Sequence, residues 1–190
     1  MSGIVVIGAS LGGLNALERV LERLPAGFAA PILVVQHRAD DNRSLLPALL
    51  DTHAELDVCE AEDKAALRPG CVLVAPAGYH ALVEPGHVEL STEEAVRFSR
   101  PSIDLAMETA AQAYGSETVG VVLTGANDDG SRGLAAIRRA GGCAIVQDPE
   151  GAERSSMPEA AIEAASPQWV LPLAEIGPRL AAIAGSEARS

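Results

Sequence analysis

A short glycine-rich turn near the start of the chain carries the first residue that could do chemistry. Residues Gly8–Gly13 read Gly-Ala-Ser-Leu-Gly-Gly, and the spacing around Ser10 matches the pattern G-x-S-x-G. Such a turn between a strand and a helix can expose a serine hydroxyl as a nucleophile. The N–H groups at the helix start can then stabilise a developing oxyanion, and the N–H of Leu11 is the best candidate. A phosphate-binding turn or simple close packing is the alternative interpretation.

His37 is the candidate base for this serine. It closely follows Ile32–Val35, an apolar run that is typical of a strand buried on both faces. Because ligands of open parallel sheets gather at the carboxyl ends of the strands, Ser10 and His37 are expected at the same edge. There an imidazole could take the proton that a serine does not lose by itself at neutral pH. The alternative is a histidine in a surface loop.

An acidic turn is expected at the same edge of the sheet. Residues Thr124–Gly130 follow the apolar run Val119–Leu123 and contain Asp128 and Asp129. A carboxylate in this turn could orient the imidazole and stabilise its cation. The same residues could instead cap the helix that follows. The turn by itself does not decide which aspartate does which of these jobs.

Hydrophobic periodicity predicts the elements that must position these residues. Leucines at helical spacing from Leu14 to Leu24 predict a first helix, which Pro25 stops. With the apolar runs on either side, this start implies a parallel pair of strands joined by a right-handed crossover. Buried strands are expected at Ile4–Ile7, Ile32–Val35, Val119–Leu123 and Ala144–Val146, with helices around Leu45–Leu50, Ser102–Tyr114, Gly130–Ala140, from Met157 onward and over Leu171–Ile183.

The middle of the chain has a different pattern. The short apolar runs Val72–Pro76, Ala81–Val83 and Val88–Leu90 are separated by Gly-Tyr and Pro-Gly turns, which predict a small antiparallel segment. The predicted fold class is therefore α/β, with a doubly wound, mostly parallel sheet flanked by helices and a small antiparallel hairpin region.

Composition excludes several classes of function. The 190 residues suit one domain, and a 48% hydrophobic content with only 3% aromatic residues favours a core of aliphatic side chains. The net charge of −12 argues against nucleic-acid binding and against adsorption to an anionic membrane. An odd number of cysteines without a CxxC spacing argues against a disulfide framework or a zinc site, so a cytoplasmic location is expected. We expect neither a signal peptide nor membrane insertion.

A dinucleotide-binding domain is a second interpretation of the glycine-rich turn. Gly8, Ser10 and Gly13 occupy the three positions of G-x-G-x-x-G, and Asp40 lies beyond the second strand, where a ribose-binding acid would stand. Against this interpretation, a serine stands at the position where the backbone must approach a pyrophosphate closely.

The ordered motifs as a set resemble a known family over nearly the whole chain. The chain is similar to the catalytic domain of the CheB-type chemotaxis receptor methylesterases (protein-glutamate methylesterases). The matching blocks are Ile7–Gly13, Val34–His37, Ala75–His80, Arg100–Asp104, Leu123–Gly130, Gln147–Asp148 and Met157–Ala161. Blocks in this order and at consistent spacing are far more specific than any one of them.

The resemblance implies a function and assigns roles by position. It implies a Ser-His-Asp triad made of Ser10, His37 and Asp129, which would remove methyl groups from glutamate side chains in the cytoplasmic helices of bacterial chemoreceptors. Related members also deamidate glutamine side chains, and neither a metal nor an organic cofactor is implied. The candidate donors to the oxyanion are the N–H groups of Leu11, Gly12 and Ala126.

The chain departs from the family pattern at several positions. Leu11 stands where the family usually has Thr, while Ala126 and Asn127 replace a Met and a Gly. Ser155–Ser156 replaces a Phe-Gly pair before Met157. The change at residue 11 keeps the backbone N–H, whereas those at 126 and 127 alter the pocket wall and with it the expected substrate preference.

The expected organisation is one catalytic domain over residues 1–184 with a frayed tail at 185–190. Because the first strand begins by Gly3, no receiver domain is expected before it. Regulation by phosphorylation would then come from elsewhere, such as a separate response-regulator protein. A non-catalytic, partner-binding member of the family is the remaining alternative.

Overall fold

The computed structural model describes residues 3–37, 45–96 and 98–187, and its strands form two sheets. The main sheet has seven strands in the order β10-β9-β8-β1-β2-β5-β3, and every neighbouring pair is parallel. Its strands are β1 (Ile4–Ala9), β2 (Ile32–Gln36), β3 (Asp57–Glu60), β5 (Cys71–Val74), β8 (Thr118–Val122), β9 (Cys143–Gln147) and β10 (Trp169–Leu171).

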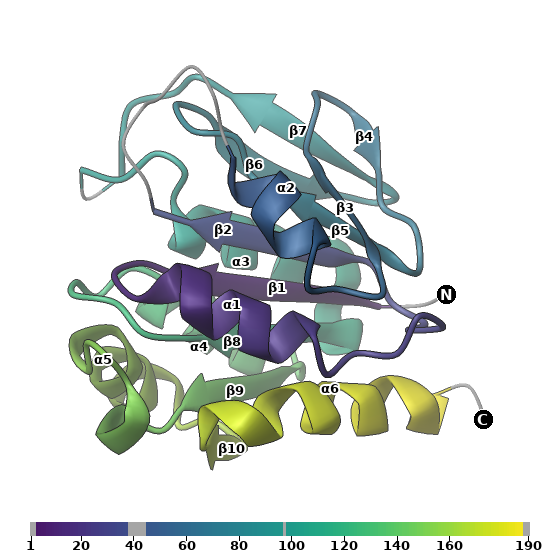
Figure 1. Ribbon diagram of the computed structural model, residues 1–190. Coiled ribbons are helices and arrows are strands. Elements are labelled where there is room, and N and C mark those ends of the chain that lie inside the picture. Colours follow the sequence, from purple (N-terminus) through teal and green to yellow (C-terminus); the bar gives the residue numbers. More distant parts are fainter. Residues whose placement is uncertain (1–2, 38–44, 97, 188–190) are drawn as a thin grey trace.

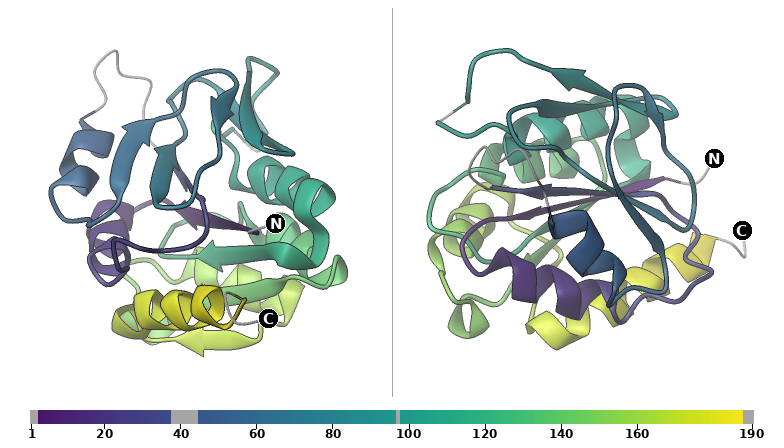
Figure 2. Two further views of the ribbon diagram at one scale, coloured as in Figure 1. Left: turned by 90° about the vertical axis from the view of Figure 1, so that its right-hand side faces the viewer. Right: turned by 45° about the horizontal axis from the view of Figure 1, so that its top comes forward.

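Helices cover both faces of this sheet, as Figures 1 and 2 show. On one face, α1 (Gly13–Leu21), α2 (Leu46–Asp51) and α6 (Leu173–Glu187) contribute apolar side chains to one buried cluster. On the other face, α3 (Ile103–Tyr114), α4 (Ser131–Arg139) and α5 (Ser156–Ala165) contribute to a second cluster. Successive strand residues alternate between the clusters, since side chains on a strand alternate between faces.

A small antiparallel sheet packs beside helix α3, near the top of Figure 1. It has the order β4-β7-β6, with β4 (Ala65–Ala66), β6 (His80–Glu84) and β7 (His87–Ser91). Val83 and Val88 join the same buried cluster as the α3 side chains. The predicted fold class, doubly wound and mostly parallel with a small antiparallel region, is thus confirmed.

One expected strand was placed in the wrong sheet. The run from Val72 was expected to pair antiparallel with its neighbours, but Cys71–Val74 is a parallel strand between β2 and β3. Val72 and Val74 are fully buried on one face and Leu73 is buried on the other, so both sides need cover. Burial on both faces is the property of a central parallel strand. The hairpin itself consists of β6 and β7.

The order of the strands reverses at β1, and this determines where a site can form. Strands β2, β5 and β3 lie on one side of β1, and the later strands β8, β9 and β10 lie on its other side. Ligands of open α/β sheets bind at the carboxyl ends of strands next to such a reversal. In Figure 1 these ends lie at the left, away from both chain termini.

Helix α6 extends to Glu187, beyond the expected domain limit at residue 184.

Candidate active site

The turn after β1 holds Ser10 at the reversal point of the sheet. Gly12 caps helix α1 with a φ of 78°, a left-handed conformation that glycine adopts without strain, and Gly13 N–H donates to the Ser10 carbonyl at 2.9 Å. Ser10 is half-buried, while the side chain of Leu11 is exposed. A side chain on Gly125 would collide with Met157 and lie 2.9 Å from the Ser10 Cβ. The serine therefore stands at a tight turn packed against the loop after β8.

Side chains from neighbouring strand ends hold this turn in place. Ser10 N–H donates to the Thr124 carbonyl at 3.0 Å, and the Thr124 hydroxyl donates to the Leu11 carbonyl at 2.9 Å. Gln36 Nε2 donates to the carbonyls of Ser10 at 2.8 Å and of His37 at 2.9 Å. One amide group thus fixes the backbone that carries the serine relative to the backbone that carries the histidine.

His37 follows β2 and contacts Asp129 with its ring. Its backbone N–H donates to the Ala9 carbonyl at 3.0 Å, and its Nε2 lies 2.7 Å from Asp129 Oδ2. The His37 side chain is 12% exposed and the Asp129 side chain is fully buried. The sequence of this turn did not decide whether Asp128 or Asp129 orients the histidine. In the structure, it is Asp129 that lies against the imidazole.

Asp129 lies against the N-terminus of helix α3. Its carboxylate accepts hydrogen bonds from the N–H groups of Ile103 at 2.7 Å and Asp104 at 2.9 Å, and from the Ser102 hydroxyl at 3.2 Å. Burial by itself raises the pKa of this carboxyl group. The hydrogen bonds from His37 and from the N–H groups of Asp104 and Ile103 outweigh burial, so the pKa lies below its ordinary value of 3.8. Asp129 is therefore ionised at neutral pH.

A second carboxylate, that of Asp104, accepts hydrogen bonds from N–H groups at the start of α4, as Asp129 does at the start of α3. Asp104, in the first turn of α3 and fully buried, accepts the N–H groups of Gly130 at 2.9 Å and Gly133 at 2.8 Å. Arg132 Nε also donates to it at 3.1 Å. Asp104 in α3 thus faces the N-terminus of α4, and Asp129 in the turn before α4 faces the N-terminus of α3. Free N–H groups and the helix dipole favour negative charge at both places.

This arrangement determines which ring nitrogen of His37 is basic. Because the ionised Asp129 can only accept, Nε2 carries the hydrogen of the neutral ring and the lone pair is on Nδ1. In the described arrangement, Asn127 Nδ2 lies 3.3 Å from Nδ1. Among the described residues, no hydrogen bond joins the Ser10 hydroxyl to the His37 ring.

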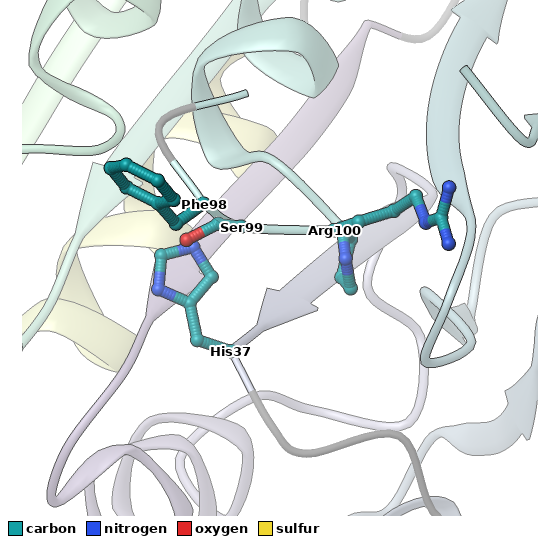
Figure 3. Close-up of a pocket in the computed structure, with 5 residues that line it drawn as sticks. His37, Phe98, Ser99 and Arg100 are labelled. Atoms are coloured by element: carbon teal, nitrogen blue, oxygen red, sulfur yellow. The ribbon is translucent and has the colours of Figure 1, made fainter. Parts of the chain in front are cut away.

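A cavity of about 320 Å³ opens beside His37, lined by His37, Phe98, Ser99, Arg100 and Pro101. In Figure 3 the His37 ring faces Phe98 and Ser99, whereas the Arg100 guanidinium extends away from it. Arg100 Nη1 donates to the carbonyls of Thr92 and Glu93, both at 3.1 Å. Arg100 therefore stabilises the loop that forms the cavity, and the cavity is open to a side chain approaching His37.

The candidate oxyanion donors lie around Ser10. Within the described parts of the chain, the N–H groups of Leu11, Gly12 and Ala126 make no hydrogen bond to other protein atoms. A substrate oxygen at the turn could accept hydrogen bonds from such groups. Which of the three would bind it stays a prediction.

Sequence reasoning missed the residues that hold the site together. Gln36, Ser102 and Asp104 each make several of the contacts described above. Gln36 directly precedes the predicted base His37, and Asp104 lies two residues after the predicted helix start at Ser102. His80, the last residue of the matching block Ala75–His80, is fully buried: its Nδ1 accepts the Ser102 N–H at 3.2 Å, and its Nε2 lies 3.1 Å from the Glu94 carbonyl. A polar residue at the end of a buried strand is the signal that could have pointed to Gln36.

The described residues contain no cluster of three or more His, Cys, Asp or Glu side chains placed to hold a metal ion. None of the helices in residues 3–37, 45–96 and 98–187 is long and apolar enough to cross a membrane. Asp40, named for the dinucleotide interpretation, lies outside the described residues.

Fold and site together define an α/β protein with a buried histidine–aspartate pair beside a serine-bearing turn. A model of the family described as CheB methylesterase matches residues 5–180, and the chain belongs to this family. The fold agrees with the crystal structure of the Thermotoga maritima CheB methylesterase catalytic domain, with a TM-score of 0.91 and 37% identity over 96% of this chain and 100% of that one. The resemblance inferred from the motifs is confirmed.

Two curated relatives differ in length. A Leptospira interrogans protein named for the paired activities protein-glutamate methylesterase and protein-glutamine glutaminase is 44% identical over 173 residues, which cover 90% of each chain. Protein-glutamate methylesterase FrzG of Myxococcus xanthus is 41% identical over 178 residues, which cover 93% of this chain but 53% of FrzG. The comparisons support the methylesterase interpretation and not the dinucleotide-binding one.

Proposed function

We propose that the protein hydrolyses methyl esters of glutamate side chains on a bacterial chemoreceptor or a related signalling protein. The observation that carries the proposal is the 2.7 Å contact between His37 and the buried Asp129, beside the Ser10 turn, in a member of the CheB methylesterase family. The names of the relatives describe the same activity. A serine, an imidazole and an ionised carboxylate at one sheet edge are the groups that ester hydrolysis requires.

In the first step, His37 Nδ1 takes the proton of Ser10 while the oxygen attacks the ester carbonyl carbon. Asp129 keeps the hydrogen on Nε2 and stabilises the imidazolium that forms. The oxyanion is held by the N–H of Leu11 and by a second N–H, from Gly12 or Ala126. Loss of one such donor typically costs about 2.7–4 kcal/mol of transition-state stabilisation.

In the second step, the carbon–oxygen bond to methanol breaks, and His37 returns the proton to the leaving oxygen. A glutamyl ester on Ser10 remains, and water activated by the same nitrogen attacks it. Its cleavage restores the Ser10 hydroxyl and leaves a glutamate carboxylate. With glutamine as substrate, the same route would release ammonia, which fits the paired name of the Leptospira relative.

The partners follow from charge and from the substrate. A net charge of −12 gives no long-range attraction to acidic receptor helices, so recognition depends on short-range docking near the cavity beside His37. We place the reaction in the cytoplasm, where the methylated receptor region lies. A separate response-regulator protein would supply control by phosphorylation.

The test is release of methanol from a methylated receptor fragment. Ser10→Ala should abolish it, because the covalent route requires the hydroxyl. Ser116→Ala is the matched control. Ser116 is exposed on the short helix Gly115–Glu117, which precedes β8, whereas the turn that packs against Ser10 follows the other end of β8. An unchanged rate in Ser10→Ala would refute the assignment. Failure of a fluorophosphonate to label Ser10 in folded protein would favour the non-catalytic alternative.

A further inference from the structure

Asn127 makes a contact that the mechanism above does not use. It lies in the turn between β8 and α4, half-buried, between the exposed residues Ala126 and Asp128. Its Nδ2 lies 3.3 Å from His37 Nδ1, and its Oδ1 accepts the backbone N–H of Asp129 at 3.2 Å. The side chain therefore bridges the base and the residue that orients the base.

The orientation of this amide follows from its partners. The Asp129 N–H can only donate, so the Asn127 oxygen must face it and the amide NH₂ must face His37. Nε2 of His37 carries the hydrogen shared with Asp129, so Nδ1 can only accept. The contact is therefore a hydrogen bond from the amide of Asn127 to the lone pair of the base.

We propose that Asn127 gates His37: its amide occupies the basic nitrogen in the resting protein and must move aside before Ser10 can be deprotonated. The inference rests on the proposed roles of Ser10 and His37. An imidazole nitrogen has one lone pair in the ring plane, so the amide and the serine hydroxyl compete for it. The absence of a hydrogen bond between Ser10 and His37 in the described arrangement agrees with this competition.

The position of Asn127 permits the movement. Both neighbouring residues are exposed, so the side chain can turn toward solvent without displacing core atoms. A bound peptide offers carbonyl oxygens to which the released NH₂ can donate. Substrate binding then replaces the contact with His37, and Asn127 acts as a positioning residue that links occupancy of the site to activation of Ser10.

The test measures the rate at which a small fluorophosphonate labels Ser10, since this reagent needs the serine and the base but no receptor docking. In labelling, the serine oxygen bonds to phosphorus, fluoride leaves and His37 takes the proton. Asn127→Ala frees Nδ1 and should label about threefold to tenfold faster, the range expected for loss of one competing hydrogen bond. Asn127→Asp places a carboxylate oxygen beside Nδ1, favours a proton there, and should label about tenfold more slowly at neutral pH.

The two variants separate gating from a structural role. Asn127→Asp retains the oxygen that accepts the Asp129 N–H, whereas Asn127→Ala loses it, so a purely structural role predicts slow labelling only in the alanine variant. Asn15→Ala, at an exposed position on α1, is the control and should label like the parent protein. Equal or slower labelling of Asn127→Ala, with its fold intact by circular dichroism, overturns the gate alone. No labelling in any variant overturns the roles of Ser10 and His37, and the gate with them.

Discussion

The two ends of the proposed catalytic site are built in different ways. At the carboxylate end, Asp129 and Asp104 are buried side chains that exchange hydrogen bonds between the N-termini of α3 and α4. At the nucleophile end, Ser10 is held through its backbone, and the side chain of Leu11 is 54% exposed. The His37 ring contacts Asp129 through Nε2, and its Nδ1 lies 3.3 Å from Asn127 Nδ2.

The difference follows from what each end must do. The carboxylate must stay ionised and keep a fixed direction, which buried N–H donors provide and water does not. The serine must reach a substrate from solvent, so its hydroxyl cannot be committed to buried partners. Substitutions at the carboxylate end should therefore affect activity and stability together, whereas exposed side chains at the nucleophile end should affect neither strongly.

The largest effect after loss of the nucleophile is expected for Asp129→Asn. An asparagine would keep its oxygen at the Oδ1 position, which accepts the N–H groups of Asp104 and Gly130, and would turn its NH₂ toward His37. Nε2 would then accept, and the hydrogen would move to Nδ1, which could no longer take the serine proton. By analogy with the same change in serine proteases, the turnover rate should fall about 10³–10⁴-fold. Methanol release from a methylated receptor fragment measures it.

Asp128→Asn is the matched control for this prediction. Asp128 is exposed and its neighbour Asp129 is the residue that contacts His37, so the same change of charge one residue earlier should leave the turnover rate within about threefold. If Asp128→Asn proved the more damaging of the two, Asp129 would not be the carboxylate that orients the imidazole.

Asp104→Ala should be the next largest effect, and mainly on stability. It leaves the buried N–H of Gly133 without an acceptor, and the N–H of Gly130 keeps only Asp129 Oδ1, so the free energy of unfolding should fall by about 1–3 kcal/mol. Urea unfolding measures the loss, and turnover should fall as well because Gly130 adjoins Asp129. Glu108→Gln is the control: Glu108 lies 3.6 Å from the half-exposed Arg132, and loss of that ion pair should cost less than about 1 kcal/mol. Equal losses of unfolding free energy in the two variants would show that the buried hydrogen bonds of Asp104 stabilise the protein no more than an exposed ion pair does.

The sequence predicted most of the fold because its main features are local. Four apolar runs, each followed by polar or small residues, marked the central strands β1, β2, β8 and β9. Edge strands were missed because their hydrophobic pattern is weak. Strand β3 is mostly exposed and is held by pairing with β5, and β10 has only three residues. Pairing partners of that kind are set by tertiary contacts, which no local pattern contains.

The site was predictable to the same extent as the sheet. Parallel strands end at one edge, which is why Ser10, His37 and the turn with Asp129 could be expected together. The mutual contacts of Asp104 and Asp129 join residues 25 to 29 positions apart and could not be read from either helix alone. Asn127 was visible as a departure from the family pattern, but its contact with His37 depends on the shape of the turn.

The smallest effect is expected for Leu11→Thr, at the nucleophile end. The side chain of Leu11 is 54% exposed, and threonine leaves the backbone N–H proposed as an oxyanion donor in place. The free energy of unfolding should therefore change by less than about 0.5 kcal/mol, and the turnover rate by less than about threefold. A fall of more than about tenfold in turnover, with stability unchanged, would show that the exposed side chain contacts the reacting substrate. In that case the nucleophile end would depend on its side chains as strongly as the carboxylate end does, and the contrast between the two would hold for stability alone.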